Sequence, residues 1–137
     1  MTDSKPAAIF LKDYQVPDFL IDRTQLKFEL DAERTRVTAN LSIRRNPDSG
    51  NKAADLVLHG QEMQLEAISI DGIALNKSCY RVSENDLTVS NVADAFELQT
   101  QVLINPVANT SLEGLYKSRT MYCTQCEAEG FRKITYY

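Results

Sequence analysis

Apolar and polar residues alternate along the first third of the chain in two long runs, 19–30 and 35–45. In a β-strand, such alternation places apolar side chains on one face and polar side chains on the other. The two runs are joined by the short polar link 31–34. The pattern therefore predicts an antiparallel hairpin of two half-buried strands.

Shorter strands with turn residues between them are predicted for the middle of the chain. Asp71-Gly72 lies between two of these strands and favours a type I′ hairpin turn, in which both central residues take positive φ. Pro106 ends the last strand, because proline cannot donate to a ladder. No window shows a convincing helical period. The predicted short strands are a run through Leu56 and Leu58 that ends at Gly60, then Leu65–Ile70, Ile73–Leu75, Tyr80–Ser83, Leu87–Ser90 and Phe96–Asn105.

Together with the two strands of the first hairpin, these make seven or eight strands. They predict an all-β fold, either an antiparallel sandwich or one large curved sheet. Periodicity alone does not choose between these two. Residues 14–137 are expected to form the β domain. Residues 1–13 are mostly polar, end in an Ile9-Phe10-Leu11 patch, and are expected to form an N-terminal arm lying across the domain.

Composition narrows the set of partners. The 137 residues include 15 basic and 19 acidic side chains, for a net charge of −4, and no basic run exceeds Arg44-Arg45. Nucleic acid or an anionic membrane surface would need a basic patch, so neither is expected as a partner.

The N-terminus lacks the basic start and long apolar stretch of a signal peptide, and three cysteines are too few for a disulfide framework. A cytoplasmic location is therefore expected.

Cys123-x-x-Cys126 is the pattern most typical of metal or redox chemistry. A structural zinc site needs four ligands, but the only other cysteine is Cys79 and the only histidine is His59. A thioredoxin-like pair belongs in a βαβ context, which this chain does not show. We interpret both cysteines as packing thiols, with a small thiol or metal protein as an alternative, and expect this chain itself to bind no metal.

The segment Cys123-Thr-Gln-Cys-Glu-Ala-Glu-Gly-Phe-Arg132 concentrates thiols, an amide, carboxylates and a guanidinium in ten residues. With Tyr14-x-x-Pro17-Asp18 and the run Leu112-Glu-Gly-Leu-Tyr-Lys-Ser118, it resembles the N-terminal β domain of the M1 family of zinc aminopeptidases. The likeness extends over nearly the whole chain and is strongest toward the bacterial branch of that family.

The resemblance implies that Gln125 and Glu127 bind substrate, with Glu127 holding the free α-amine of a peptide. That amine has a pKa of roughly 7.7–8 and is mostly cationic at neutral pH. A carboxylate recognises it through charge-assisted hydrogen bonds worth about 1.5–3 kcal/mol. If the segment is extended, Gln125 points the same way as Glu127.

The resemblance further implies that the parent protein is a zinc-dependent metalloprotease, a hydrolase that removes N-terminal residues from peptides. Zinc and every catalytic residue belong to a downstream catalytic domain that is absent here, so no catalytic residue can be named. The β domain would be incomplete at its C-terminal end and inactive alone. Its partners would be peptides with a free N-terminus and the downstream domain. An apolar tail left uncovered by that domain would cause weak self-association; it comprises Leu115, Tyr116, Phe131, Ile134, Tyr136 and Tyr137.

One alternative comes from a different functional class. A stand-alone β-sandwich that binds another protein and catalyses nothing would show the same alternating pattern. The sequence of the gene beyond codon 137 would separate these interpretations, because a His-Glu-x-x-His motif there would mark the peptidase.

Overall fold

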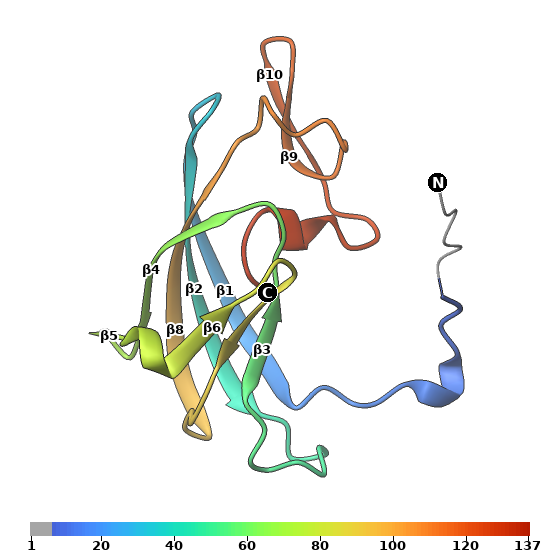
Figure 1. Cartoon of the computed structure of the whole chain (residues 1–137), viewed down its shortest axis with the longest axis vertical. Coiled ribbons are helices and arrows are strands. Elements are labelled where there is room, and N and C mark those ends of the chain that lie inside the picture. The colour runs from blue at the N-terminus through green and yellow to red at the C-terminus, as the bar shows by residue number, and fades with distance from the viewer. Residues whose placement is uncertain (1–6) are drawn as a thin grey trace.

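The computed structural model describes residues 7–137, which contain ten strands, three short 3₁₀ helices and no α-helix (Figure 1). The strands are β1 (Phe19–Glu29), β2 (Thr35–Arg45), β3 (Leu56–His59), β4 (Gln64–Ile70), β5 (Ile73–Ala74), β6 (Tyr80–Val82), β7 (Asp86–Val89), β8 (Ala95–Ile104), β9 (Gly114–Ser118) and β10 (Met121–Gln125). The 3₁₀ helices are η1 (Leu11–Asp13), η2 (Lys77–Cys79) and η3 (Gly130–Lys133). The predicted all-β class is confirmed.

The predicted first hairpin is present, with β1 and β2 paired from Phe19 opposite Arg45 to Glu29 opposite Arg36. Its turn is held by Asp31, whose carboxylate accepts hydrogen bonds from the backbone N–H groups of Glu33 and Arg34. The apolar positions of β2 are fully buried, as the alternation predicts. Near the far end of the edge strand β1, however, Phe28 is 39% exposed, although Val37 opposite it on β2 is fully buried.

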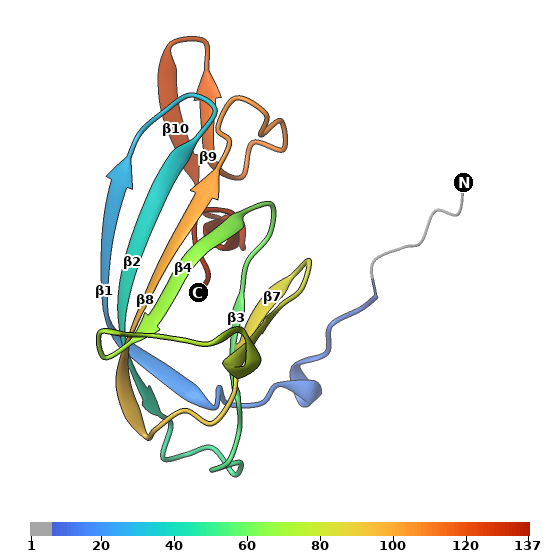
Figure 2. The same cartoon turned by 60° about the vertical axis from the view of Figure 1, so that its left-hand side comes forward.

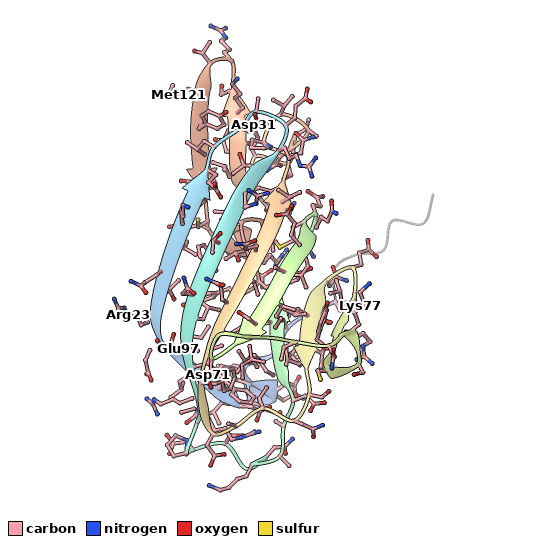
Figure 3. All side chains as sticks on the ribbon, turned by 90° about the vertical axis from the view of Figure 1, so that its left-hand side faces the viewer. Arg23, Asp31, Asp71, Lys77, Glu97 and Met121 are labelled. Carbon is pink, nitrogen blue, oxygen red and sulfur yellow. The ribbon has the colours of Figure 1, made fainter. Side chains whose placement is uncertain are left out.

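Two sheets of unequal size form the domain. The larger sheet has the order β1-β2-β8-β4-β5 and curves as it twists, and the smaller has the order β3-β7-β6 (Figure 2). The outer face of the larger sheet carries polar side chains such as Arg23 and Glu97 (Figure 3). The smaller sheet covers its concave face. The fold therefore combines the two architectures that periodicity left open: it is a sandwich whose principal layer is a large curved sheet.

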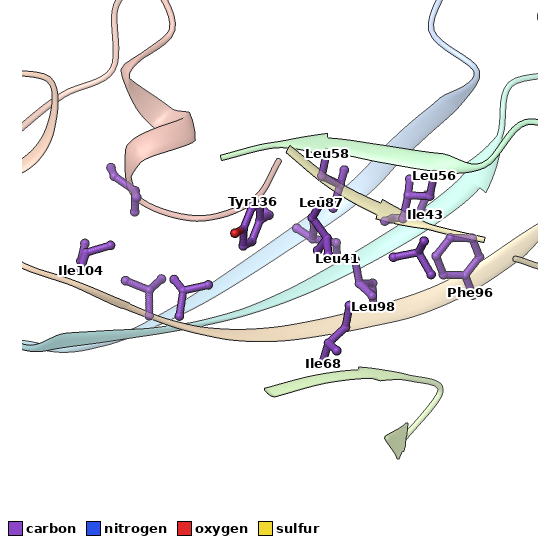
Figure 4. Close-up of a cluster of buried hydrophobic side chains, with 14 of the residues drawn as sticks. Leu41, Ile43, Leu56, Leu58, Ile68, Leu87, Phe96, Leu98, Ile104 and Tyr136 are labelled. Carbon is purple, nitrogen blue, oxygen red and sulfur yellow. The ribbon is translucent and has the colours of Figure 1, made fainter. Parts of the chain in front are cut away.

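The core lies between these layers (Figure 4). Leu41 and Leu98 contribute from the larger sheet, and Leu56 and Leu87 from the smaller one, all with at most 1% of their surface exposed. Fully burying a Leu-sized side chain stabilises the fold by roughly 1.5–3 kcal/mol.

The turn at Asp71-Gly72 has the predicted chemistry. Asp71 has φ +49° and Gly72 has φ +81°, and β4 and β5 pair on either side of them. Both central residues thus occupy the left-handed region that a type I′ turn requires.

The C-terminal tail packs into the domain, and the expected exposed cluster is wrong for three of its members. Leu115, Ile134 and Tyr136 belong to the core, with Tyr136 only 1% exposed. The backbone of Tyr137 exchanges two hydrogen bonds with that of His59, of 2.9 and 3.0 Å. These bonds attach the tail to the end of β3, so that three of the six side chains expected to drive self-association lie in the core, whereas Tyr137 remains exposed.

Residues 7–13 of the predicted N-terminal arm extend away from the domain (Figures 1 and 2), so the expectation that the arm lies across the domain is wrong for these residues. Ile9 is 97% exposed and Leu11 is 90% exposed. The apolar patch makes no contact that would hold the arm against either sheet. Residues 1–6 of the predicted arm lie outside the described residues.

Candidate functional site

The candidate site is built on the hairpin β9–β10, which projects beyond the turn between β1 and β2 (Figure 3). The two strands pair from Ser118 opposite Met121 to Gly114 opposite Gln125. Gln125 is the last residue of β10, so its backbone position is fixed by the hairpin. The chain turns at residues 127–129 and enters η3 at Gly130.

This turn changes how Gln125 and Glu127 relate to each other. The segment is not extended beyond Gln125, so strand alternation does not align their side chains. Instead, the Glu127 backbone N–H donates a hydrogen bond of 3.1 Å to the Gln125 side-chain Oε1. The structure thus brings the two predicted substrate-binding residues together in one loop, by a contact that the sequence pattern does not predict.

The loop closes tightly on itself. The Gly130 N–H donates to the Cys126 carbonyl at 2.9 Å. A Cβ on Gly130 would lie 2.2 Å from the backbone oxygen of Gln125, a distance that real Cβ atoms do not show. Only glycine therefore allows this approach. The peptide bond between Glu127 and Ala128 is cis.

Lys133 and Arg132 connect η3 to the rest of the domain. The Lys133 side chain is only 10% exposed. Its Nζ lies 3.1 Å from Ser111 Oγ and 3.4 Å from Glu113 Oε2. The Arg132 guanidinium pairs with the carboxylate of Glu129. The Arg132 carbonyl accepts a hydrogen bond of 2.9 Å from the Gln61 backbone N–H. The end of the loop is thus held by contacts from several elements.

Glu127 itself is exposed. Among residues 7–137, no ion pair or side-chain hydrogen bond engages its carboxylate, whereas the carboxylate of Glu129, in the same turn, is paired with Arg132. The backbone of Glu127 is therefore fixed while its charge remains available.

A hollow of about 330 Å³ borders the loop without containing the predicted site residues. It meets the loop at Ala128 and Glu129, and its wall includes the edge-to-face pair of Phe131 and Tyr137, whose ring centroids are 4.9 Å apart. Neither Gln125 nor Glu127 lines it. The remaining lining residues are His59, Gln61, Asn85 and Arg132.

The described residues do not provide a metal centre. Within residues 7–137, no three His, Cys, Asp or Glu side chains lie close enough together to hold a metal ion. Cys79, Cys123 and Cys126 are all free thiols. His59 is the last residue of β3. Zinc therefore does not fit the residues of this chain that the structure describes. No helix among them is long and apolar enough to cross a membrane.

Sequence reasoning missed the supports of the loop. Neither the hairpin 114–125 nor η3 was predicted, and Gly130 and Lys133 were not singled out. A signal was available in Gly114 and Gly130, which bracket the segment and lie close together: a Cβ on Gly114 would be 3.2 Å from the Gly130 carbonyl oxygen. Lone glycines in a polar stretch predict only a turn, however, not which segments meet.

The fold and the loop together define an unequal β-sandwich with an anchored polar loop at one end, which presents a free carboxylate. The sequence model described as the Peptidase M1 N-terminal domain matches residues 13–137. The chain belongs to this family, and the resemblance drawn from residues 123–132 is confirmed.

Individual relatives agree. The chain is 47% identical over 137 residues to an Aminopeptidase N of Caulobacter vibrioides and 41% identical over 133 residues to an Aminopeptidase N of Escherichia coli K12. These matches cover 100% and 97% of the chain but only 16% and 15% of the relatives. An aminopeptidase A of Legionella pneumophila, solved in complex with aspartic acid, matches with a TM-score of 0.86 and 26% identity, over 92% of this chain and 15% of that one. The chain thus spans about one sixth of the length of the relatives it matches.

Proposed function

We propose that this chain is the N-terminal substrate-recognition domain of a cytoplasmic zinc aminopeptidase, and that the Glu127 carboxylate binds the free α-amine of the peptide. The observation that carries the proposal is the state of Glu127: its backbone is fixed by the loop, and its carboxylate has no partner among the described residues. The supporting context is membership of the Peptidase M1 N-terminal domain family.

The chemistry of the two groups explains the selectivity. The α-amine at the end of a peptide is mostly cationic at neutral pH, whereas an internal peptide nitrogen carries no charge. When a bound substrate shields a carboxylate from water, the loss of hydration costs free energy unless a cation lies beside the carboxylate. Glu127 therefore favours peptides whose first residue has a free amine. Gln125 lies in the same loop, where its side-chain oxygen accepts a hydrogen bond from the Glu127 backbone N–H.

The hydrolytic step belongs to other parts of a longer protein. Zinc in such enzymes activates a water molecule, and the described residues of this chain supply no ligand set for it. The chain alone would accordingly bind the amino end of a peptide and hydrolyse nothing. Its partners would be peptide substrates and the catalytic domain that completes the site.

The test replaces Glu127 in the longer protein that carries this domain. Glu127→Ala and Glu127→Gln should each lower kcat/KM for an amino-acyl reporter substrate by roughly 10- to 100-fold, the equivalent of about 1.5–3 kcal/mol. The matched control is Glu129→Ala, which removes a carboxylate from the same turn. Because Glu129 is exposed and its ion pair is worth about 0–1 kcal/mol, this variant should stay within about fivefold of the wild type.

The zinc content of each purified variant should equal that of the wild type. A Glu127→Ala enzyme with activity within about twofold of wild type, a difference under about 0.4 kcal/mol, would show that Glu127 is not the amine anchor. Equal losses of kcat/KM in the Glu127 and Glu129 variants would contradict a specific role for Glu127 and indicate a general effect of removing negative charge from the loop.

A further inference from the structure

Gln125 has a single side-chain acceptor, and the structure uses it inside the loop. A glutamine amide offers one carbonyl oxygen and two N–H donors. The carbonyl oxygen of Gln125 accepts the hydrogen bond from the Glu127 backbone N–H, at 3.1 Å. We infer that Gln125 is a positioning residue, which holds the backbone of Glu127 so that its carboxylate meets the substrate amine. This inference rests on the proposed function of Glu127.

Glu127 needs such support because no ladder holds it. β10 ends at Gln125, and Glu127 lies in the turn that follows. The Gln125 side chain ties the Glu127 N–H back to the last residue of the hairpin, whose partner across the ladder is Gly114. A recognition group must be held to within about half an ångström of its productive position. One hydrogen bond from a rigid strand end supplies such a restraint.

Gln125 is itself held on its backbone side. Its carbonyl oxygen lies against Gly130, where a Cβ would approach to 2.2 Å, and Gly130 is bonded to Cys126. The residue that restrains Glu127 is thus fixed by the pairing of β10 and by the closure of the loop. Gln125 therefore connects the hairpin to the turn.

A direct contact between Gln125 and substrate is the competing role, and two substitutions separate the two roles. Gln125→Met keeps the length of the side chain but has no amide acceptor. Gln125→Asn keeps an acceptor that can reach the N–H two residues onward, as in Asx turns, but draws the amide nitrogen back by one methylene. A positioning residue is therefore rescued by Asn, whereas a direct substrate contact is not. Gln99→Met, at an exposed position on β8 far along the chain, is the matched control.

The first measurement is a double-mutant cycle on kcat/KM in the longer protein. Gln125→Met should lower kcat/KM by about fivefold, the effect of losing one neutral hydrogen bond. In a Glu127→Ala background the same change should have an effect of less than about twofold, because Gln125 acts through Glu127. An equal factor in both backgrounds would overturn the inference and assign Gln125 to the substrate. If Glu127→Ala alone had no effect, the proposed function would fail instead.

The second measurement does not depend on activity. Hydrogen exchange of the Glu127 backbone amide should be about fivefold faster in Gln125→Met than in the wild type, and should return close to the wild-type rate in Gln125→Asn. Gln99→Met should leave it unchanged. Equal exchange in wild type and Gln125→Met would show that Gln125 does not hold Glu127, whatever the role of Glu127 in catalysis.

Discussion

Glu127 is one of 19 acidic residues in the chain, and its distinguishing feature is how its backbone is held. Its N–H is bonded to Gln125, and the loop around it is closed at Gly130. The residue types Gln125 and Glu127 could be singled out from the sequence because the ten-residue segment resembles a family motif. The supports could not, since they depend on which backbone atoms meet after folding.

Gly130 provides the sharpest test at the scale of one residue. Gly130→Ala places a methyl group against the Gln125 carbonyl, and a backbone atom cannot give way cheaply. We expect the free energy of unfolding to fall by about 1–3 kcal/mol, as in other overpacked sites. Chemical denaturation of the chain would measure it.

Gly50→Ala is the control for that change. A Cβ at Gly50 would meet no atom within 4 Å, and the variant should unfold within about 0.5 kcal/mol of the wild type. If the Gly130 and Gly50 variants unfolded at the same denaturant concentration, the close approach of Gly130 to Gln125 would be contradicted.

At the scale of elements, alternation predicted the strands of both main sheets, and Asp71-Gly72 predicted its turn. The hairpin β9–β10 escaped prediction for a physical reason. Its turn includes Arg119 at φ +55°, a conformation in which arginine is uncommon, so composition gave no turn signal. The position of the arm was mispredicted because an apolar patch indicates that residues favour burial, but it does not indicate which surface they would pack against.

An ion pair across the larger sheet gives a pH prediction at this scale. Arg36 on β2 reaches over β8 to Glu66 on β4, with Nε 2.8 Å from Oε2. Glu66 lies where the register of β4 shifts, between Leu65 and Ala67. The hydrogen bond and the charge of Arg36 hold the pKa of Glu66 below its ordinary value, against a smaller opposing effect of desolvation.

Because the pKa of Glu66 is lower in the folded state, the ion pair contributes stability above the unfolded-state pKa. That contribution is lost as pH falls through the folded-state pKa. Glu66→Gln should therefore have a lower Tm than the wild type at pH 7, and the difference should disappear at an acid pH below the folded-state pKa of Glu66. A difference in Tm that is the same at both pH values would contradict a stabilising role for the charge.

At the scale of the whole molecule, the domain is a sandwich that closes its own core and presents one anchored loop. Residues 134–136 of its C-terminal tail are buried, and its two most exposed large apolar residues, Ile9 and Leu11, lie in the arm. The chain spans about one sixth of the length of its aminopeptidase relatives. We therefore propose that this domain binds the amino end of a peptide, and that the zinc chemistry lies in the rest of a longer protein.

The most direct test of this reading compares two competitive inhibitors of the longer protein that differ only in whether the α-amine is present. The wild-type enzyme at neutral pH should bind the amine-bearing inhibitor at least about tenfold more tightly, as expected for a charge-assisted hydrogen bond. In the Glu127→Ala enzyme the two inhibition constants should converge to within about threefold. If the variant kept the full preference for the amine, recognition of the free N-terminus would not reside in Glu127, and the central claim would be wrong.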